Sequence, residues 1–177
     1  MKKAAGKRTK LLRSRAVERR DAASAPKTGD KFVIRPAESH DIGAISALDA
    51  RITSLSKKQH WQDLLARSKS LDFAQFFLVA DAPASSKSLL GFIVGEIRAW
   101  EFGSAPSGWV YALSVEPGVR EHGVGEALLA AIEAEFKRRK ITKMRTMVAK
   151  DSPLPMLFFR AEGMMAGPYI QLEKDLT

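Results

Sequence analysis

The stretch Val115–Leu129, VEPGVREHGVGEALL, decides how the rest of the chain is interpreted. It follows an apolar run, Trp109–Val115, which is rich in the β-branched and aromatic residues that fit a pleated, half-buried strand. Pro117 and Gly118 then interrupt the strand, because proline lacks a backbone donor and glycine favours turns. From Gly125 onward, apolar residues recur at helical spacing. The sequence therefore predicts a strand, a glycine-containing loop and a helix, in that order.

The loop has the features of an anion-binding site. The first turn of a helix leaves backbone N–H groups unpaired at the positive end of the helix dipole, so an anion is stabilised there. Gly123 and Gly125 have no Cβ to hold a phosphate away, and they tolerate positive φ. Arg120 adds a planar, permanently charged donor three residues before Gly123. We therefore expect main-chain recognition of a phosphate or pyrophosphate.

Three other interpretations of this loop compete. A dinucleotide-binding fingerprint needs a third small residue at position 128 and an acidic residue about 20 positions further on. The sequence has Leu128 at the first position and the basic region Lys143–Arg145 near the second, and both argue against this fingerprint. A P-loop needs a Gly-Lys-Ser/Thr ending, which Gly125, Glu126 and Ala127 do not supply. Taken alone, the two glycines are explained as well by a tight turn before an ordinary helix.

The complete spacing V-x-P-x-x-R-x-x-G-x-G-x-x-L resembles the acyl-CoA-binding signature of the GNAT superfamily of N-acetyltransferases. The signature positions are filled by Val115, Pro117, Arg120, Gly123, Gly125 and Leu128. The resemblance implies acetyl-CoA as co-substrate, with its pantetheine arm along the strand and its pyrophosphate on the loop amides. It also implies an α/β (α+β) fold with a mixed, twisted central sheet of six or seven strands flanked by about four helices.

The other elements expected from the sequence extend this resemblance over about 145 residues, from Phe32 to the end. They are, in chain order, a strand at Phe32–Pro36, a helix at Ile42–Ile52 with Asp41 as N-cap, a helix at about Lys57–Ser68, strands at Phe73–Asp81 and Leu89–Trp100 joined by a turn at Pro83–Ser88, a strand at Ile141–Ala149 parallel to Trp109–Val115, a last helix beginning at Ser152 and Pro153 and ending at Gly163, and sheet-forming residues Ala166–Leu176. The family places the first two helices over the acceptor, so Arg51 to His60 should help to select it.

The end of the chain resembles a late family motif, N-x-x-A-x-x-L/F-Y-x-x-x-G-F, in degenerate form. Its positions hold Ser152, Pro155, Phe159, Gly163 and Met164. With the loop and strand, the expected coenzyme-binding residues are Leu113, Ser114, Val115, Arg120, Glu121, His122, Gly123, Val124, Gly125, Glu126, Ser152 and Phe159.

The family pattern is incomplete at the catalytic positions. Phe159 takes the place of a tyrosine that often delivers a proton to the departing thiolate, and phenylalanine cannot do so. Trp109 and Met147 stand where relatives carry a catalytic glutamate. The phenols that remain are Tyr111 and Tyr169, and the nearby carboxylates are Glu96, Glu101 and Glu116. Of these we take Tyr111 and Glu96 as the candidate catalytic residues.

Glu96 itself has two interpretations. Period two places it on one face with Phe92, Val94 and Arg98. Its carboxylate is either paired with Arg98 or a neighbour, or raised in pKa and available as a base.

A site with no strong base constrains the acceptor. At pH 7 a lysine amine with a pKa of about 10.4 is neutral roughly once in 2,500 molecules, whereas an α-amine near 7.7 is neutral roughly once in six. The expected reaction is direct attack of a primary amine on acetyl-CoA, with an α-amine of a peptide, protein or small molecule favoured over lysine. The alternative is a non-catalytic acyl-CoA-binding or RNA- or ribosome-associated adaptor with the same fold.

Composition sets the remaining limits. Of the 177 residues, the first thirty carry ten Lys or Arg against three Asp or Glu, so most of the net charge of +9 lies there. We expect a disordered basic tail at 1–30, with at most weak nucleic-acid contact, and an acetyltransferase domain at 31–177. The chain has no cysteine, its three histidines show no metal-ligand spacing, and it contains no signal peptide core or long apolar run. We expect no metal, no membrane span and a cytoplasmic protein.

Overall fold

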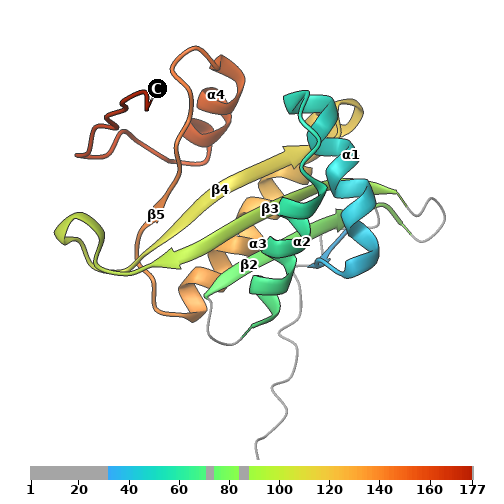
Figure 1. The fold of residues 1–177 in the computed structure, drawn as a ribbon, viewed down its shortest axis with the longest axis horizontal. Helices are drawn as coiled ribbons and strands as arrows, with labels where there is room; N and C mark the ends of the chain where they lie inside the picture. The colour runs from blue at the N-terminus through green and yellow to red at the C-terminus, as the bar shows by residue number, and fades with distance from the viewer. Residues whose placement is uncertain (1–31, 71–73, 84–87, 177) are drawn as a thin grey trace, which may run out of the picture.

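The computed structural model of the chain describes residues 32–70, 74–83 and 88–176. These residues form one mixed sheet of five strands with helices on both faces (Figure 1). The strand order is β1-β2-β3-β4-β5; successive strands are antiparallel except for β4 and β5, which are parallel as expected. The strands are β1 (Val33–Pro36), β2 (Gln75–Asp81), β3 (Leu89–Arg98), β4 (Ser107–Val115) and β5 (Met144–Arg145). The helices are α1 (Ile42–Thr53), α2 (Lys58–Lys69), α3 (Val124–Arg138) and α4 (Pro153–Ala161), with short 3-10 helices η1 (Ser39–Asp41), η2 (Glu101–Gly103) and η3 (Pro117–His122).

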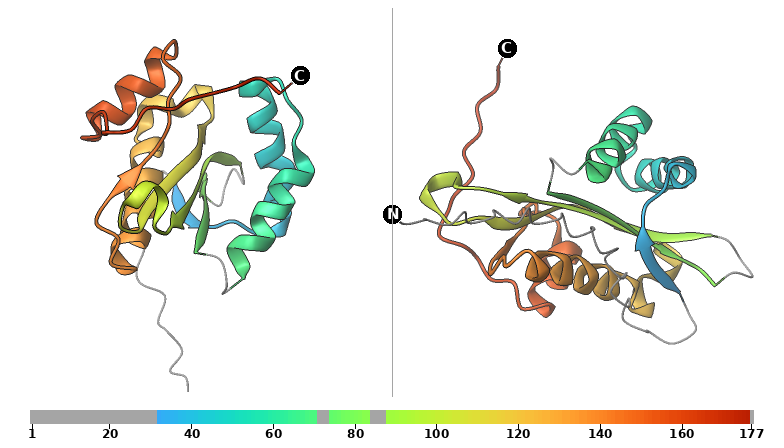
Figure 2. Two further views of the ribbon diagram at one scale, coloured as in Figure 1. Left: turned by 60° about the vertical axis from the view of Figure 1, so that its left-hand side comes forward. Right: turned by 90° about the horizontal axis from the view of Figure 1, so that it is seen from below.

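The alternation of apolar residues along the strands builds one core on each face of the sheet. Helices α1 and α2 cover one face and α3 the other (Figure 2). Under α3, Ile93 packs with Leu128 and Ile132, and on the opposite face Phe92 and Trp61 meet with their ring centroids 5.0 Å apart. The four predicted helices are confirmed, with ends within a few residues of those expected.

Asp41 takes the predicted N-cap position of α1, but its side chain does not cap the helix. Its carboxylate instead accepts two hydrogen bonds from Arg35, at 2.7 and 2.8 Å, and one from the backbone N–H of Glu38 at 2.7 Å. Burial opposes the charged form, yet these donors outweigh it and hold the pKa of Asp41 below its usual value. Arg35 also donates to Asp81 at 2.6 Å. The arginine thereby joins β1, β2 and the start of α1.

Strand β4 contains a bulge at Tyr111. Ala112 pairs with Val94 and Val110 pairs with Gly95, so Tyr111 is one residue more than β3 can match. The extra residue shifts the alternation of side chains: Val110 and Leu113, three apart, both pack in the core under α3.

The prediction of a strand over Ile141–Ala149 is wrong in its length, because β5 has only two residues, Met144 and Arg145. Strand β5 pairs with β4 only at Gly108 and Trp109. At the next position the Thr146 hydroxyl donates to the Val110 carbonyl at 2.8 Å. This hydrogen bond comes from a side chain and not from the backbone, so it does not extend the strand. Beyond this point the described backbone of the segment is in no strand, so the edge of β4 from Tyr111 to Val115 has no neighbouring strand.

The prediction that Ala166–Leu176 completes the sheet is wrong. Residues 164–176 form no helix or strand, because the two-residue β5 offers too short an edge for another strand. The described part of the chain therefore has five strands in place of six or seven. This C-terminal segment projects from the sheet on the side of α1 and α2 (Figure 2).

Several expectations concern residues outside the described ranges: the tail at 1–30, most of the turn at Pro83–Ser88 and the first residue of the strand expected from Phe73. Among the described residues, no helix is both long and apolar enough to cross a lipid bilayer.

Candidate active site

The predicted loop joins β4 to α3 through η3 and Gly123. Gly123 is the N-cap of α3 and adopts φ +78°, a left-handed conformation that favours glycine. The first hydrogen bond of the helix runs from the Ala127 N–H to the Gly123 carbonyl at 3.0 Å. The N–H groups of Val124, Gly125 and Glu126 precede this bond and have no acceptor within the helix. They form the expected set of main-chain donors at the positive end of α3.

The two glycines of the loop serve different purposes. A Cβ at Gly123 would meet nothing within 4 Å, so this position needs glycine for its backbone conformation. Gly125 has an ordinary helical backbone, but a Cβ there would lie 3.2 Å from the ring of Phe158 and 3.7 Å from Val115. Glycine at this position lets α3, α4 and the end of β4 approach one another.

The open edge of β4 leads directly to this loop. The Glu116 N–H donates to the Leu90 carbonyl at 2.8 Å, in register with the ladder between β4 and β3. Because the bonded residues of an antiparallel pair alternate, the N–H groups of Leu113 and Val115 point away from β3. These N–H groups, and the C=O groups of the same two residues, lie on the edge of β4 that has no neighbouring strand in the described part of the chain, because β5 ends before it.

Charged side chains surround the loop. Arg120 is exposed, and its Nε lies 3.4 Å from the Val115 carbonyl, so the guanidinium stands beside the end of β4. Arg51 at the end of α1 forms an ion pair with Glu116, which connects the segment Arg51–His60 to the loop. Glu121, His122 and Glu126 are exposed. Main-chain donors, a glycine cradle and an exposed arginine fit a diphosphate.

Tyr111 and Glu96, the two candidate catalytic residues, are brought into one polar cluster on the face covered by α1 and α2. The Gln75 side-chain amide donates a hydrogen bond to the Tyr111 hydroxyl. Burial, and then the charge of Glu96, raise the pKa of Tyr111 to about 12. The phenol is therefore protonated at neutral pH and can donate a proton, but it cannot act there as a base.

Glu96 follows the first of its two interpretations. Its carboxylate accepts a hydrogen bond from Arg98 Nε at 2.6 Å, and Arg98 also lies 3.9 Å from Glu101. The carboxylate of Glu96 is therefore paired rather than isolated among apolar neighbours.

Ser152 and Phe159 lie on α4 rather than on the loop. Ser152 occupies the N-cap position of α4 without a side-chain cap bond, and Pro153 begins the helix as expected. Phe159 is buried in the core under α3. Its neighbour Phe158, which is not among the expected coenzyme-binding residues, is the residue against Gly125. No local pattern distinguishes these adjacent phenylalanines, since helix rotation decides which one faces the loop.

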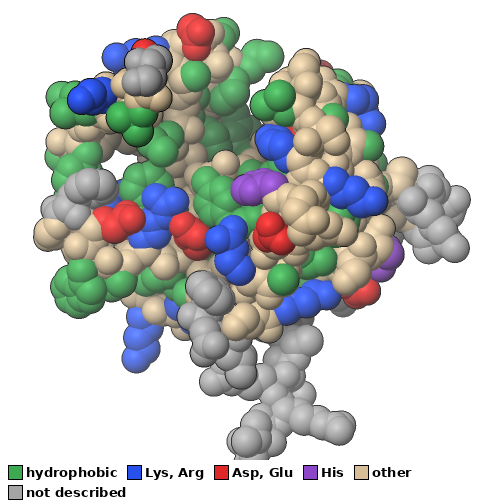
Figure 3. All heavy atoms as spheres, viewed as in Figure 1, with side chains coloured by type: hydrophobic (Ala, Val, Ile, Leu, Met, Phe, Trp, Pro, Cys, Tyr) green, Lys and Arg blue, Asp and Glu red, His purple; other side chains and the backbone are tan. Residues whose placement is uncertain are grey.

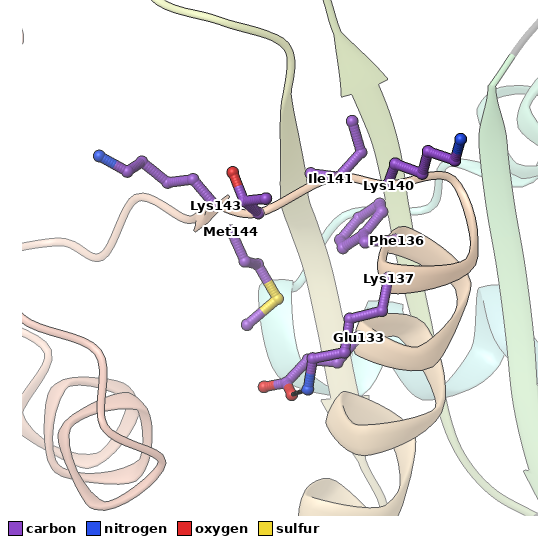
Figure 4. Close-up of a pocket in the computed structure, with 8 residues that line it drawn as sticks. Glu133, Phe136, Lys137, Lys140, Ile141, Lys143 and Met144 are labelled. Carbon is purple, nitrogen blue, oxygen red and sulfur yellow. Dashed lines mark hydrogen bonds and ion pairs between the residues drawn. The ribbon is translucent and has the colours of Figure 1, made fainter.

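A shallow hollow of about 530 Å³ lies elsewhere, at the C-terminal end of α3 (Figure 4). It contains Phe136, Ile141 and Met144, with Lys137, Lys140 and Lys143 around it. α3 has 15 residues, roughly 22 Å at 1.5 Å per residue, so the hollow is distant from the Gly123 loop. Hydrogen-bonding geometry, rather than the hollow, locates the candidate active site.

Comparison with known proteins agrees with this geometry. Residues 44–156 match the acetyltransferase (GNAT) family model. A search of curated protein sequences finds no match.

Solved structures with the same fold include aminoglycoside 6'-N-acetyltransferase AAC(6')-Ih from Acinetobacter baumannii (TM-score 0.69, 16% identity, 82% of this chain and 99% of that chain). Aminoglycoside N-acetyltransferase AAC(6')-Iy in complex with CoA gives a TM-score of 0.71 at 16% identity over 83% of this chain and 96% of that one. A transcriptional regulator from Bacillus halodurans gives 0.68 at 15% over 82% and 99%. With a family model that spans most of the sheet, the loop and the helices on both faces, this chain belongs to the GNAT family of acetyltransferase enzymes.

Proposed function

We propose that the protein is an N-acetyltransferase that transfers an acetyl group from acetyl-CoA to a primary amine by direct attack. The observation that carries the proposal is the open edge of β4 leading into the N-terminus of α3 through Gly123. A strand edge with no neighbouring strand among the described residues suits the amide-containing pantetheine arm, and a helix N-terminus suits a diphosphate.

The coenzyme would be held mainly by main-chain groups. The backbone of Leu113–Val115 would bind the pantetheine arm, and the N–H groups of Val124–Glu126 with Arg120 would bind the diphosphate. Glu121 and His122 lie on the exposed rim of the same loop. Ser152 and Phe159 would contribute through the position of α4, with Phe158 the side chain beside the loop.

Acetyl-CoA supplies an activated thioester, and the chain supplies polarisation and protons. A β4-edge N–H, of Leu113 or Val115, would donate to the thioester oxygen as negative charge develops on it. Tyr111, protonated at neutral pH, would donate a proton to the departing thiolate. Glu96 is paired with Arg98, and its charge acts on Tyr111 in the same polar cluster.

The lack of a carboxylate at Trp109 and Met147, where relatives carry a catalytic glutamate, favours an α-amine as acceptor. Two of the neighbouring structures belong to aminoglycoside acetyltransferases. An amine whose pKa lies near 7.7 is already neutral in a large fraction of molecules at pH 7, and it needs less help from the enzyme than lysine does. We propose that the acceptor is the α-amine of a peptide, protein or small molecule. We also propose that residues 31–177 are the catalytic domain of a cytoplasmic protein, and that the basic tail at 1–30 is a weak nucleic-acid tether.

A free-thiol assay tests the proposal with little background, because the chain has no cysteine. Purified protein, acetyl-CoA and a panel of amines should release thiol, and Arg120→Glu should reduce the rate at least tenfold. Arg160→Glu on α4 is the matched control for a charge reversal at an exposed arginine and should leave the rate within about twofold. Calorimetry with coenzyme A separates the alternatives: heat of binding without thiol release with any amine supports a non-catalytic acyl-CoA-binding adaptor. No heat at millimolar coenzyme A would overturn both.

A further inference from the structure

A row of four residues crosses the sheet on the face covered by α1 and α2. Gln75, Glu96, Trp109 and Arg145 are direct register partners on β2, β3, β4 and β5. The next row along the same face is Phe77, Val94 and Ala112, all packed in the apolar core under α1 and α2. The row therefore marks where this face changes from an apolar core to a polar surface.

Arg145 is held at the end of the row in an unusual way. Its guanidinium carbon lies 5.9 Å from the ring centroid of Trp109 and 5.0 Å from that of Tyr169, and Nη1 donates to Ser104 Oγ at 3.1 Å. Among the described residues it forms no ion pair, in contrast to Arg98, which has Glu96 and Glu101. The contacts with two aromatic rings fix the guanidinium without neutralising it, so it retains donors for a planar anion.

Two buried polar atoms in the same row lack a partner within the described ranges. Gln75 is 6% exposed, and its Oε1 accepts no hydrogen bond although its Nε2 donates to Tyr111. The indole N–H of Trp109 is likewise buried and meets no acceptor in the described part of the chain. Unsatisfied buried groups are rare and costly, and one acceptor and one donor in the same row suit a polar ligand.

The position of the row agrees with a ligand site. The C-terminal segment projects on the same side of the sheet as α1 and α2, and a recess with a largely hydrophobic floor lies between them (Figure 3). Arg145 is one strand and about two residues away from Tyr111, a separation of roughly 8 Å from strand spacing and rise. An amine that reacts beside Tyr111 would thus have Arg145 within reach of a group several bonds away.

We propose that the acceptor amine carries a carboxylate, and that Arg145 binds it as a specificity-determining residue. This inference rests on the proposed function. The spacing fits a peptide α-amine with Asp or Glu as its second or third residue, and it disfavours polycationic amines.

Matched peptides test the inference. Ala-Glu-Ala-Ala-amide and Ala-Gln-Ala-Ala-amide differ only by the charge at the second residue, and a second pair moves the change to the third. In one of the two pairs we expect kcat/KM to be at least tenfold higher for the acidic peptide, with spermidine poorer than either. Arg145→Gln should bring the ratio close to one while the rate with the neutral peptide stays within about threefold. Arg145→Lys should retain part of the preference, and Arg160→Gln all of it.

The outcomes separate the inference from the proposed function. Equal use of both peptides in each pair, or an unchanged ratio in Arg145→Gln, would overturn the inference and leave N-acetylation intact. If no amine is acetylated, the inference can still be tested by peptide binding to the protein with coenzyme A, monitored by tryptophan fluorescence. Tighter binding of an acidic peptide that is lost in Arg145→Gln supports the carboxylate site. Equal binding of acidic and neutral peptides would overturn it.

Discussion

The ring of Phe158 in α4 lies against the backbone of Gly125 in the first turn of α3, so that a Cβ at position 125 would come within 3.2 Å of the ring. The contact joins the candidate diphosphate loop to the last helix. It predicts a coupling between two positions 33 residues apart in the sequence.

Gly125→Ala should gain less stability than an equivalent substitution elsewhere. Gly43 is the matched control, because it is also the second residue of a helix and a Cβ there meets nothing within 4 Å. Gly43→Ala should raise the free energy of unfolding by about 0.5–1 kcal/mol. The free energy of unfolding of Gly125→Ala should be lower than that of Gly43→Ala by about 0.5–1 kcal/mol, because the added Cβ crowds the Phe158 ring. In a Phe158→Leu background the deficit should disappear. Urea denaturation of the four variants measures the coupling, and additive effects would contradict the contact.

Tyr111 should titrate far from an ordinary phenol. Its pKa is raised to about 12, so the folded protein keeps the proton when the unfolded chain has already lost it near pH 10. Stability relative to Tyr111→Phe is therefore complete below pH 10 and declines as the pH rises toward 12. Ultraviolet difference titration of the two tyrosines, compared with the variant, assigns the step. A Tyr111 step near pH 10 would be the contrary result.

Tyr111→Phe should also reduce turnover. Loss of a proton donor in the transition state is expected to lower kcat by about 100-fold, with little change in KM for acetyl-CoA. Tyr169→Phe is the control, since that ring contacts Arg145 through its face and the ring is retained. Equal kcat for Tyr111→Phe and wild type would assign the phenol a structural role only.

Gly108→Ala should be destabilising, because a Cβ there would lie 2.5–2.7 Å from ring atoms of the buried Phe136. Overpacking of this kind costs about 1–3 kcal/mol. Gly118→Ala, where a Cβ meets nothing within 4 Å, should change stability by less than about 0.5 kcal/mol. Thermal unfolding distinguishes the two, and a milder effect of Gly108→Ala in a Phe136→Leu background would identify the ring as the cause.

Asp41→Asn should remove an acid-sensitive part of the stability. The folded pKa of Asp41 lies below its unfolded value, so its contribution is present above about pH 4 and is lost as the pH falls through the folded pKa. At pH 7 the variant should lose about 1–3 kcal/mol, and the difference from wild type should shrink below pH 4. Asp81→Asn, which leaves Arg35 bonded to Asp41, should cost less. A pH-independent difference in melting temperature would exclude this ion pair as the source.

Local patterns were sufficient for the elements whose physics is local. Helix α3 begins beside Gly123 because a left-handed residue precedes a run with helical periodicity, and both features are visible in the sequence. The family resemblance located the same loop, and the match over residues 44–156 confirms the family.

Features that depend on distant partners could not be predicted. The bulge at Tyr111 exists only relative to β3, so a period-two pattern in β4 gives no sign of it. Arg145 could not be placed beside Trp109 without the register of β5, which is set by one short parallel pairing. The C-terminal segment has strand-like composition, but composition does not provide an edge to pair with.

The divergence of β5 from β4 affects how this sequence can evolve. A strand whose N–H and C=O groups are exposed at an edge can hold a ligand with its peptide backbone, and every amino acid except proline supplies the same two groups. Substitutions along Leu113–Val115 are then limited by the two cores rather than by the ligand. Chains can therefore share this fold at 16% identity, because the groups exposed at such an edge do not depend on the side chains.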